Sequence, residues 1–155
     1  MPLPKLTKPV LLVAFRRPDL TRQAFDILRR VRPPALYIAL DAPRPSRLGE
    51  AAACAEVKSV LRNIDWPCTV HRNYAEANLG SGGRVPSAIS WMFEQEEECI
   101  ILEDDILPSE SFFYYCQELL DYYRDEPRVM TISGQLGDPR CGKTKYSYFF
   151  SKYTR

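Results

Sequence analysis

Three consecutive carboxylates, Glu103, Asp104 and Asp105, follow the apolar run of residues 99–102. An isoleucine-rich run of this kind is typical of a strand that is buried on both faces of a parallel sheet. Acids grouped at the end of such a strand repel one another unless a cation or hydrogen-bond donors lie beside them. Because Mg²⁺ takes carboxylates together with substrate phosphates, the cluster predicts a metal–diphosphate site. The plainer alternative is a solvated acidic turn after a core strand.

Polar residues that could bind a nucleotide follow two other expected strands. Arg16 and Arg17 come after a strand expected over residues 9–15, and Asp41 comes after one expected over residues 35–40. The planar, permanently charged fork of arginine can donate to a phosphate or to a base edge. A carboxylate can accept from a base N–H or a ribose hydroxyl. The competing interpretations are exposed residues at a helix start for the arginines and a turn residue for Asp41.

A glycine-rich segment, residues 77–84, is expected as a loop before a helix over about residues 85–97. Glycines allow the backbone to approach a diphosphate closely, and a helix N-terminus supplies N–H donors and a positive dipole. Arg84 adds a positive charge at the same place. The segment could equally be a connecting loop with no ligand.

The order of the expected elements indicates an α/β fold with a mostly parallel, Rossmann-like sheet and helices on both faces. Apolar patterning predicts strands over residues 9–15, 35–40, 68–74, 99–102, 129–134 and 146–150, and helices over residues 20–31, 48–61, 85–97 and 109–123. The strand over residues 68–74 alternates weakly and is expected near a sheet edge. Right-handed crossovers bring the carboxyl ends of the strands to one edge, where α/β proteins bind ligands.

Length and composition fit one ordinary globular domain. The chain has 155 residues, of which 45% are apolar and 26% charged. A net charge of +1 gives no bulk attraction for nucleic acid or a membrane surface, and no apolar stretch approaches the length of a transmembrane helix. Five cysteines without a CxxC pair are typical of a reduced protein, so we expect a cytoplasmic location and no structural zinc site.

Four segments of the sequence resemble segments of a known protein family. These segments are PVLLVAFRRPD, ALYIALDAP, NLGSGGRVPSAISWMFE and CIILEDDILPSESFFYYCQELLDYYRDEPRVMTISG. They are similar to GT-A-fold glycosyltransferases, the nucleotide-diphospho-sugar transferases. The likeness is to bacterial members of a haemolysin-like group and, more distantly, to N-acetylglucosaminyltransferase I. It covers roughly residues 9–153. The EDD triplet alone is a weak signal, but EDD within IILEDDILPS, after the glycine segment and before FFYYCQELL, is much more specific.

The resemblance implies a GT-A fold and transfer of a sugar from a nucleotide-diphospho-sugar, most simply a UDP-sugar, with Mn²⁺ or Mg²⁺ as cofactor. By position it implies Asp105 as the direct metal ligand, with Glu103 beside it in the metal group. It implies a nucleotide-binding group in which Arg17 and Asp41 contact the nucleotide and Arg84 the diphosphate side; the full group is Phe15, Arg17, Asp41, Gly82, Arg84 and Asp104.

The family continues beyond the aromatic segment at residues 146–150 into an acceptor-binding half that carries, in inverting enzymes, the catalytic base. The resemblance therefore implies that residues 1–155 are a single donor-binding domain, truncated before the acceptor half. Two alternatives remain open, a non-catalytic nucleotide-sugar-binding module and another metal-dependent phosphoryl or nucleotidyl transferase; the missing GxxxxGK[ST] motif argues against a P-loop enzyme. The aromatic segment could also form an exposed strand edge that pairs with a second copy.

Overall fold

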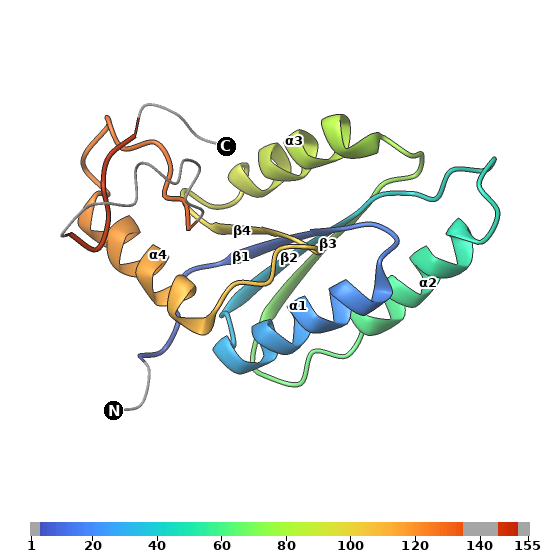
Figure 1. Ribbon diagram of the computed structural model, residues 1–155, viewed down its shortest axis with the longest axis horizontal. Coiled ribbons are helices and arrows are strands. Elements are labelled where there is room, and N and C mark those ends of the chain that lie inside the picture. The colour runs from blue at the N-terminus through green and yellow to red at the C-terminus, as the bar shows by residue number, and fades with distance from the viewer. Residues whose placement is uncertain (1–3, 135–145, 152–155) are drawn as a thin grey trace.

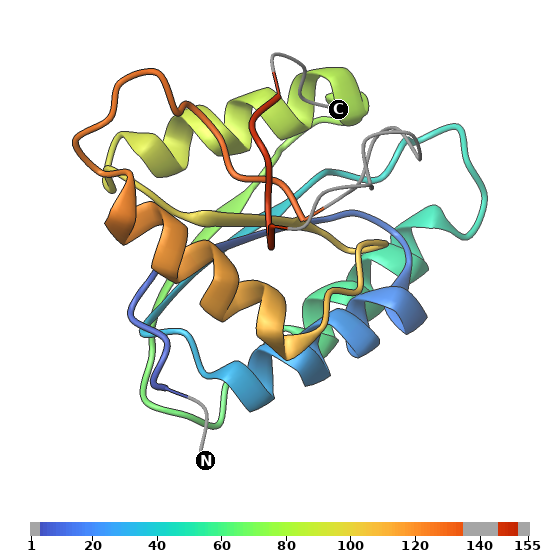
Figure 2. The same ribbon diagram turned by 60° about the vertical axis from the view of Figure 1, so that its left-hand side comes forward.

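The computed structural model describes residues 4–134 and 146–151. Its centre is a four-stranded, all-parallel sheet in the order β3-β2-β1-β4. The strands are β1 (Val10–Ala14), β2 (Ala35–Leu40), β3 (Thr69–Tyr74) and β4 (Ile100–Glu103), and the helices are α1 (Pro18–Val31), α2 (Glu50–Val60), α3 (Gly80–Phe93) and α4 (Glu110–Tyr122). Figures 1 and 2 show α3 on one face of the sheet and α1, α2 and α4 on the other. The predicted α/β fold with a parallel, Rossmann-like sheet covered on both faces is therefore confirmed.

Strand β1 is the most enclosed part of the sheet. All five of its residues are buried, because β2 and β4 pair with its two edges and helices cover its two faces. Leu12 aligns with Ile38 of β2 and Leu102 of β4, and these three side chains belong to one core cluster. A continuous apolar sequence is what a strand in this position requires.

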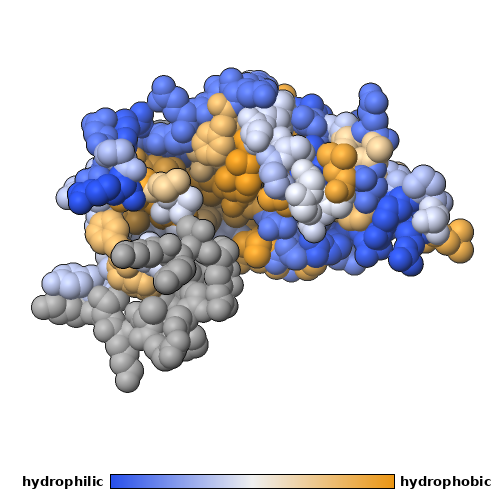
Figure 3. Space-filling view, turned by 90° about the horizontal axis from the view of Figure 1, so that it is seen from above, coloured by the Kyte–Doolittle hydropathy of each residue, from blue (hydrophilic) through white to orange (hydrophobic). Residues whose placement is uncertain are grey.

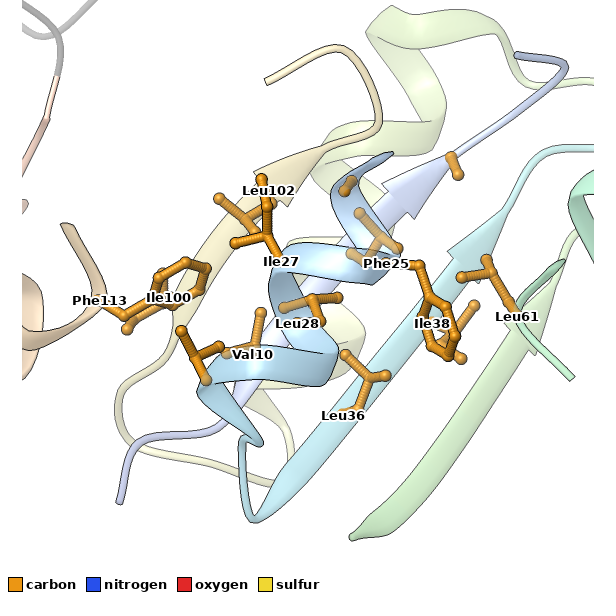
Figure 4. Packing of buried hydrophobic residues seen from close by; sticks show 14 of the residues in the cluster. Val10, Phe25, Ile27, Leu28, Leu36, Ile38, Leu61, Ile100, Leu102 and Phe113 are labelled. Atoms are coloured by element: carbon orange, nitrogen blue, oxygen red, sulfur yellow. The ribbon is translucent and has the colours of Figure 1, made fainter. Parts of the chain in front are cut away.

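The larger core lies between the sheet and helices α1, α2 and α4. Figure 4 shows Phe25 and Leu28 of α1 directed toward the strands, with Phe113 of α4 beside Ile100. The smaller core lies on the other face, where Ala88 and Met92 of α3 pack on β1 and β2. The two cores pack the sheet between its helices on both faces.

The glycine segment differs from the prediction, because it is helical. Helix α3 begins at Gly80 rather than at residue 85, and it ends at Phe93 rather than at residue 97. Gly80 has a φ of +68°, which glycine adopts without strain. The helix can start this early because an acceptor from another strand end takes its first N–H groups, as described below.

The prediction that β4 is buried on both faces is wrong. Its residues alternate between buried and exposed, and Ile101 is 37% exposed. The reason is position, since β4 is at the edge of the described sheet. Figure 3 looks onto the α3 side of the molecule and shows apolar side chains on the surface there; Phe93 at the end of α3 is also exposed. The expected edge position of the third strand, now β3, is confirmed.

Two expected strands are absent from the described residues. Residues 129–134 and 146–150 are irregular, although Ile132 packs against the larger core. Tyr148 and Phe150 instead pack their rings around Tyr123 at the end of α4. The strand edge expected to recruit a second copy is therefore not formed, and a homodimer remains untested. Residues 135–145, between these two segments, lie outside the described residues. No helix in the described part of the chain has the length and apolar composition needed to cross a bilayer.

The enclosure of β1 yields a prediction for stability. Leu12→Ala should lower the free energy of unfolding by about 3 kcal/mol, because it removes buried methyl groups and leaves a cavity between two neighbouring strands. Leu48→Ala is the matched control, since Leu48 is fully exposed and the same change should cost less than about 0.5 kcal/mol. Urea denaturation of both variants makes the comparison. Equal costs at the two positions would contradict the central placement of β1.

Candidate functional site

The predicted site residues lie at the carboxyl edge of the sheet, the side at which all of its parallel strands end. Residues 15–17 follow β1, Asp41 follows β2, and residues 104–105 follow β4, while α3 begins after β3 at Gly80. All four strands run in the same direction, so these segments lie at one edge (Figure 1). The convergence that the sequence predicted is therefore present in the structure.

Asp104 joins the ends of β1 and β4. Its side chain is only 1% exposed, and one oxygen accepts a hydrogen bond from the backbone N–H of Phe15 at 3.2 Å. The other oxygen accepts from Nε of Arg17 at 2.9 Å and also forms a close ion pair with Nη2 of the same guanidinium. The backbone N–H of Asp104 donates to the carbonyl of Val13 at 3.0 Å. Both oxygens of this predicted nucleotide-binding residue are thus engaged within the protein.

Arg17 bridges the two aspartates. Its Nη1 donates to Oδ2 of Asp105 at 2.7 Å, and the two side chains are 45% and 41% exposed. Partial burial lowers the pKa of Arg17, but the hydrogen bonds and charges of Asp104 and Asp105 outweigh it, so the pKa is raised overall. The repulsion expected within the acid cluster is therefore relieved by donors from the end of β1.

The acid cluster offers only part of a metal site. Glu103 is exposed and aligns with Val13, which places it on the α3-facing side of the sheet, and Arg17 occupies one oxygen of Asp105. Over residues 4–134 and 146–151, no three His, Cys, Asp or Glu side chains gather closely enough to hold a metal. Mg²⁺ needs only one or two protein carboxylates when phosphates and water complete its shell. Half-exposed Asp105 therefore fits a metal shared with a phosphate ligand better than a metal held by the protein alone.

Asp41 lies at the N-terminus of α3. Its side chain is buried, and Oδ1 accepts from the backbone N–H groups of Ala42 and Leu79, both at 2.9 Å. Oδ2 accepts from the side-chain amide of Asn78 at 3.1 Å and from the N–H of Gly80 at 3.0 Å. Leu79 at the N-cap has no polar side chain, so the acceptor comes from the end of β2. The Asn78 amide could have signalled this arrangement, because Asn is common where a chain turns into a helix.

Gly82 and Arg84 lie on different sides of helix α3, one exposed and the other buried. Gly82 is exposed, and a Cβ there would meet nothing within 4 Å. Arg84 is only 4% exposed, and its Nη2 donates to the carbonyl of Asn73 at 2.6 Å and to the Asn73 side chain at 3.1 Å. Its Nε has no partner among the described residues. Burial lowers the pKa of Arg84, while the charge of Asp41 acts in the opposite direction.

A second ion-paired group lies beside Phe15, and it adds Glu50 and Arg44, which the sequence interpretation did not include, to Arg16. Buried Glu50, the first residue of α2, accepts from Nη1 of Arg16 at 2.7 Å and from the backbone N–H of Arg44 at 2.8 Å. Nε of Arg44 donates to it at 3.0 Å. The guanidinium carbons of Arg16 and Arg44 lie 5.7 and 5.8 Å from the centre of the Phe15 ring. Arg44, a basic residue in the loop after β2, was the sequence signal that could have indicated this group.

Comparisons of the chain with protein-family models, curated proteins and solved structures give no significant match. The family expected from the four sequence segments therefore stays a prediction, and the case for a function depends on the residues and their geometry.

The Glu50 group yields a prediction for pH dependence. Hydrogen bonds from the Arg44 side chain, more than any other effect, lower the pKa of Glu50 from 4.5 to about 2. A carboxyl with a lowered pKa stabilises the folded chain above its unfolded pKa, and this contribution is lost as the pH falls through the folded pKa. The difference in stability between the parent and Glu50→Gln should therefore be constant at neutral pH and shrink from about pH 4.5 to about pH 2. Chemical denaturation across this range measures it.

The control for this measurement is Glu56→Gln, on the exposed side of the same helix. Exposed ion pairs contribute little, so this variant should differ from the parent by less than about 1 kcal/mol at neutral pH. A difference for Glu50→Gln that persists unchanged down to pH 2 would mean that the Glu50 carboxylate is not held by the arginines.

Proposed function

We propose that this chain binds a nucleotide-diphospho-sugar at the carboxyl edge of its sheet and forms the donor site of a metal-dependent glycosyltransferase with a GT-A fold. The observation that carries the proposal is the joint placement of Arg17, Asp104 and Asp105. They come from the ends of two neighbouring parallel strands and form one ion-paired group at the edge where open α/β sheets bind ligands. These are residues that the family resemblance assigns to the nucleotide and the metal.

The exposed half of this group suits a diphosphate. Arg17 and Asp105 are both half-exposed, so their contact can be exchanged at low cost. A guanidinium donates well to phosphate oxygens, and a carboxylate is a normal ligand for Mn²⁺ or Mg²⁺. A bound metal would offset the negative charge that develops on a departing diphosphate. Arg17 would then hold a phosphate, while Asp104 keeps the end of β1 in place.

Two neighbouring features support the rest of the ligand. The open surface over Gly82, at the start of α3, allows close approach of a phosphate, with the charge of Arg84 behind it. On the other side, the Phe15 ring and the guanidiniums of Arg16 and Arg44 provide an aromatic and hydrogen-bonding surface for the nucleoside.

A non-catalytic binding module is the second candidate, and one observation favours it. Asp104 and Asp105 are both paired with Arg17 in the described structure, and the family resemblance assigns the catalytic base to the acceptor-binding half rather than to these acids. Donor binding without sugar transfer would fit this arrangement. Assays of nucleotide-sugar consumption, run beside binding measurements, distinguish the two candidates.

Calorimetric titration with UDP and a panel of UDP-sugars tests the proposal. We expect binding in the presence of Mn²⁺ or Mg²⁺ and its loss on addition of a chelator, because the metal would join Asp105 to the phosphates. Asp105→Asn should abolish the metal-dependent binding and change stability by less than about 1 kcal/mol, since its ion pair is half-exposed.

Asp26→Asn is the matched control, because Asp26 is also a half-exposed aspartate paired with an arginine but lies on α1. It should bind UDP as the parent does. Binding by Asp105→Asn at parental strength would show that the metal site is wrong. Failure of the parent to bind any nucleotide with either metal would show that the proposed function is wrong.

A further inference from the structure

We propose that Asp41 is a positioning residue, whose carboxylate fixes the start of α3 and thereby the diphosphate side of the site, and that it does not bind the nucleoside base. The inference rests on the proposed function for its ligand. It assigns to Asp41 a role different from the nucleotide contact that the sequence resemblance implies.

The hydrogen bonds of Asp41 leave little room for a ligand. A carboxylate has about four acceptor positions, and four donors from two segments, Ala42 and residues 78–80, occupy them at 2.9 to 3.1 Å. Three of these donors are backbone N–H groups, which cannot turn away without moving the chain. The side chain is only 5% exposed. A base N–H could reach it only by displacing a donor that the start of α3 needs.

Apart from Asp41, the start of α3 is held by hydrogen bonds from the Asn78 amide to the carbonyl of Ala42 at 2.7 Å and from Arg84 to Asn73, neither of which engages its first backbone N–H groups. Glycine occupies positions 80, 82 and 83, and glycine loses more conformational freedom on ordering than any other residue. Added Cβ atoms at Gly80 and Gly82 would meet nothing within 4 Å, so neighbouring side chains do not confine the backbone there. Leu79 is half-exposed and supplies no cap. The carboxylate of Asp41 therefore holds the backbone N–H groups of a segment in which glycine makes ordering costly.

The negative charge of Asp41 is a second favourable interaction with helix α3. A negative charge at a helix N-terminus is favourable, because the dipole is positive there. Arg84 lies about one helical turn after Gly80 and is buried without an ion pair in the described structure. The charge of Asp41 favours the ionised form of Arg84. Removal of Asp41 would leave uncapped N–H groups and a buried guanidinium without compensation. Both effects would displace the segment that carries Gly82 and Arg84.

The two possible roles of Asp41 give different results with three ligands, UDP, GDP and inorganic pyrophosphate. If Asp41 positions α3, Asp41→Ala should weaken binding of all three by a similar factor, about tenfold or more, and leave the preference between UDP and GDP unchanged. Amide exchange at Leu79 and Gly80, followed by NMR without ligand, should accelerate by about tenfold or more. Asn78→Ala removes the side-chain amide that donates to both Asp41 and the carbonyl of Ala42 while leaving the backbone donors of Asp41 in place, and it should give the same pattern more weakly.

Other outcomes are equally informative. If Asp41→Ala changes the preference between UDP and GDP while pyrophosphate binding and amide exchange stay parental, Asp41 contacts the base, and the inference is overturned while the proposed function stands. If the parent binds no nucleotide, the proposed function fails, while amide exchange at Gly80 still reports whether Asp41 fixes the start of α3. If Asp41→Ala does not fold, Asn78→Ala carries the same comparison, and parental exchange at Gly80 in that variant together with an altered base preference overturns the inference.

Discussion

The buried carboxylate of Asp104 holds the ends of β1 and β4 together, and the remainder of the candidate site depends on this contact. An unpartnered carboxylate at 1% exposure would be very unfavourable, so the N–H of Phe15 and the guanidinium of Arg17 must stay beside it. The same solution recurs at the other strand ends. Asp41 takes the N–H groups at the start of α3, and Glu50 takes Arg16 and the backbone of Arg44. Each buried acid accepts donors from a distant part of the chain.

This arrangement decides which groups remain available at the surface. The buried acids are satisfied, while the guanidiniums that they hold are each about half-exposed. Fixed arginines lose less conformational freedom when they bind than free ones do, which favours binding of an anion at this edge. The parallel strands bring these segments to one edge of the sheet. The buried acids fix the arginines there, and the arginine side chains are partly exposed to solvent. A nucleotide is the ligand class that combines an anionic group with a ring and hydrogen-bonding edges.

The sequence predicted the sheet and the edge because both follow from local patterns. The continuous apolar runs of β1 and β2 need two covered faces, and parallel strands bring their carboxyl ends together. The early start of α3 could not be predicted, because its cap comes from Asp41 at the end of another strand. The exposure of Ile101 depends on which strand is at the edge. The apolar run at residues 129–134 forms no strand, since strand formation depends on a pairing partner that a local pattern does not specify.

The same sequence signal marks residues with two different functions. A charged residue after a strand can bind a ligand or hold the fold, and the type and spacing are identical in both cases. Exposure separates them. The Arg17–Asp105 contact is half-exposed and worth at most about 1 kcal/mol, whereas removing the donors of a buried acid costs several kcal/mol. A ligand at this edge should therefore displace the contact between Arg17 and Asp105 and leave the one between Arg17 and Asp104 intact. The sequence predicts a site at this edge, and burial determines which of its residues can change partners.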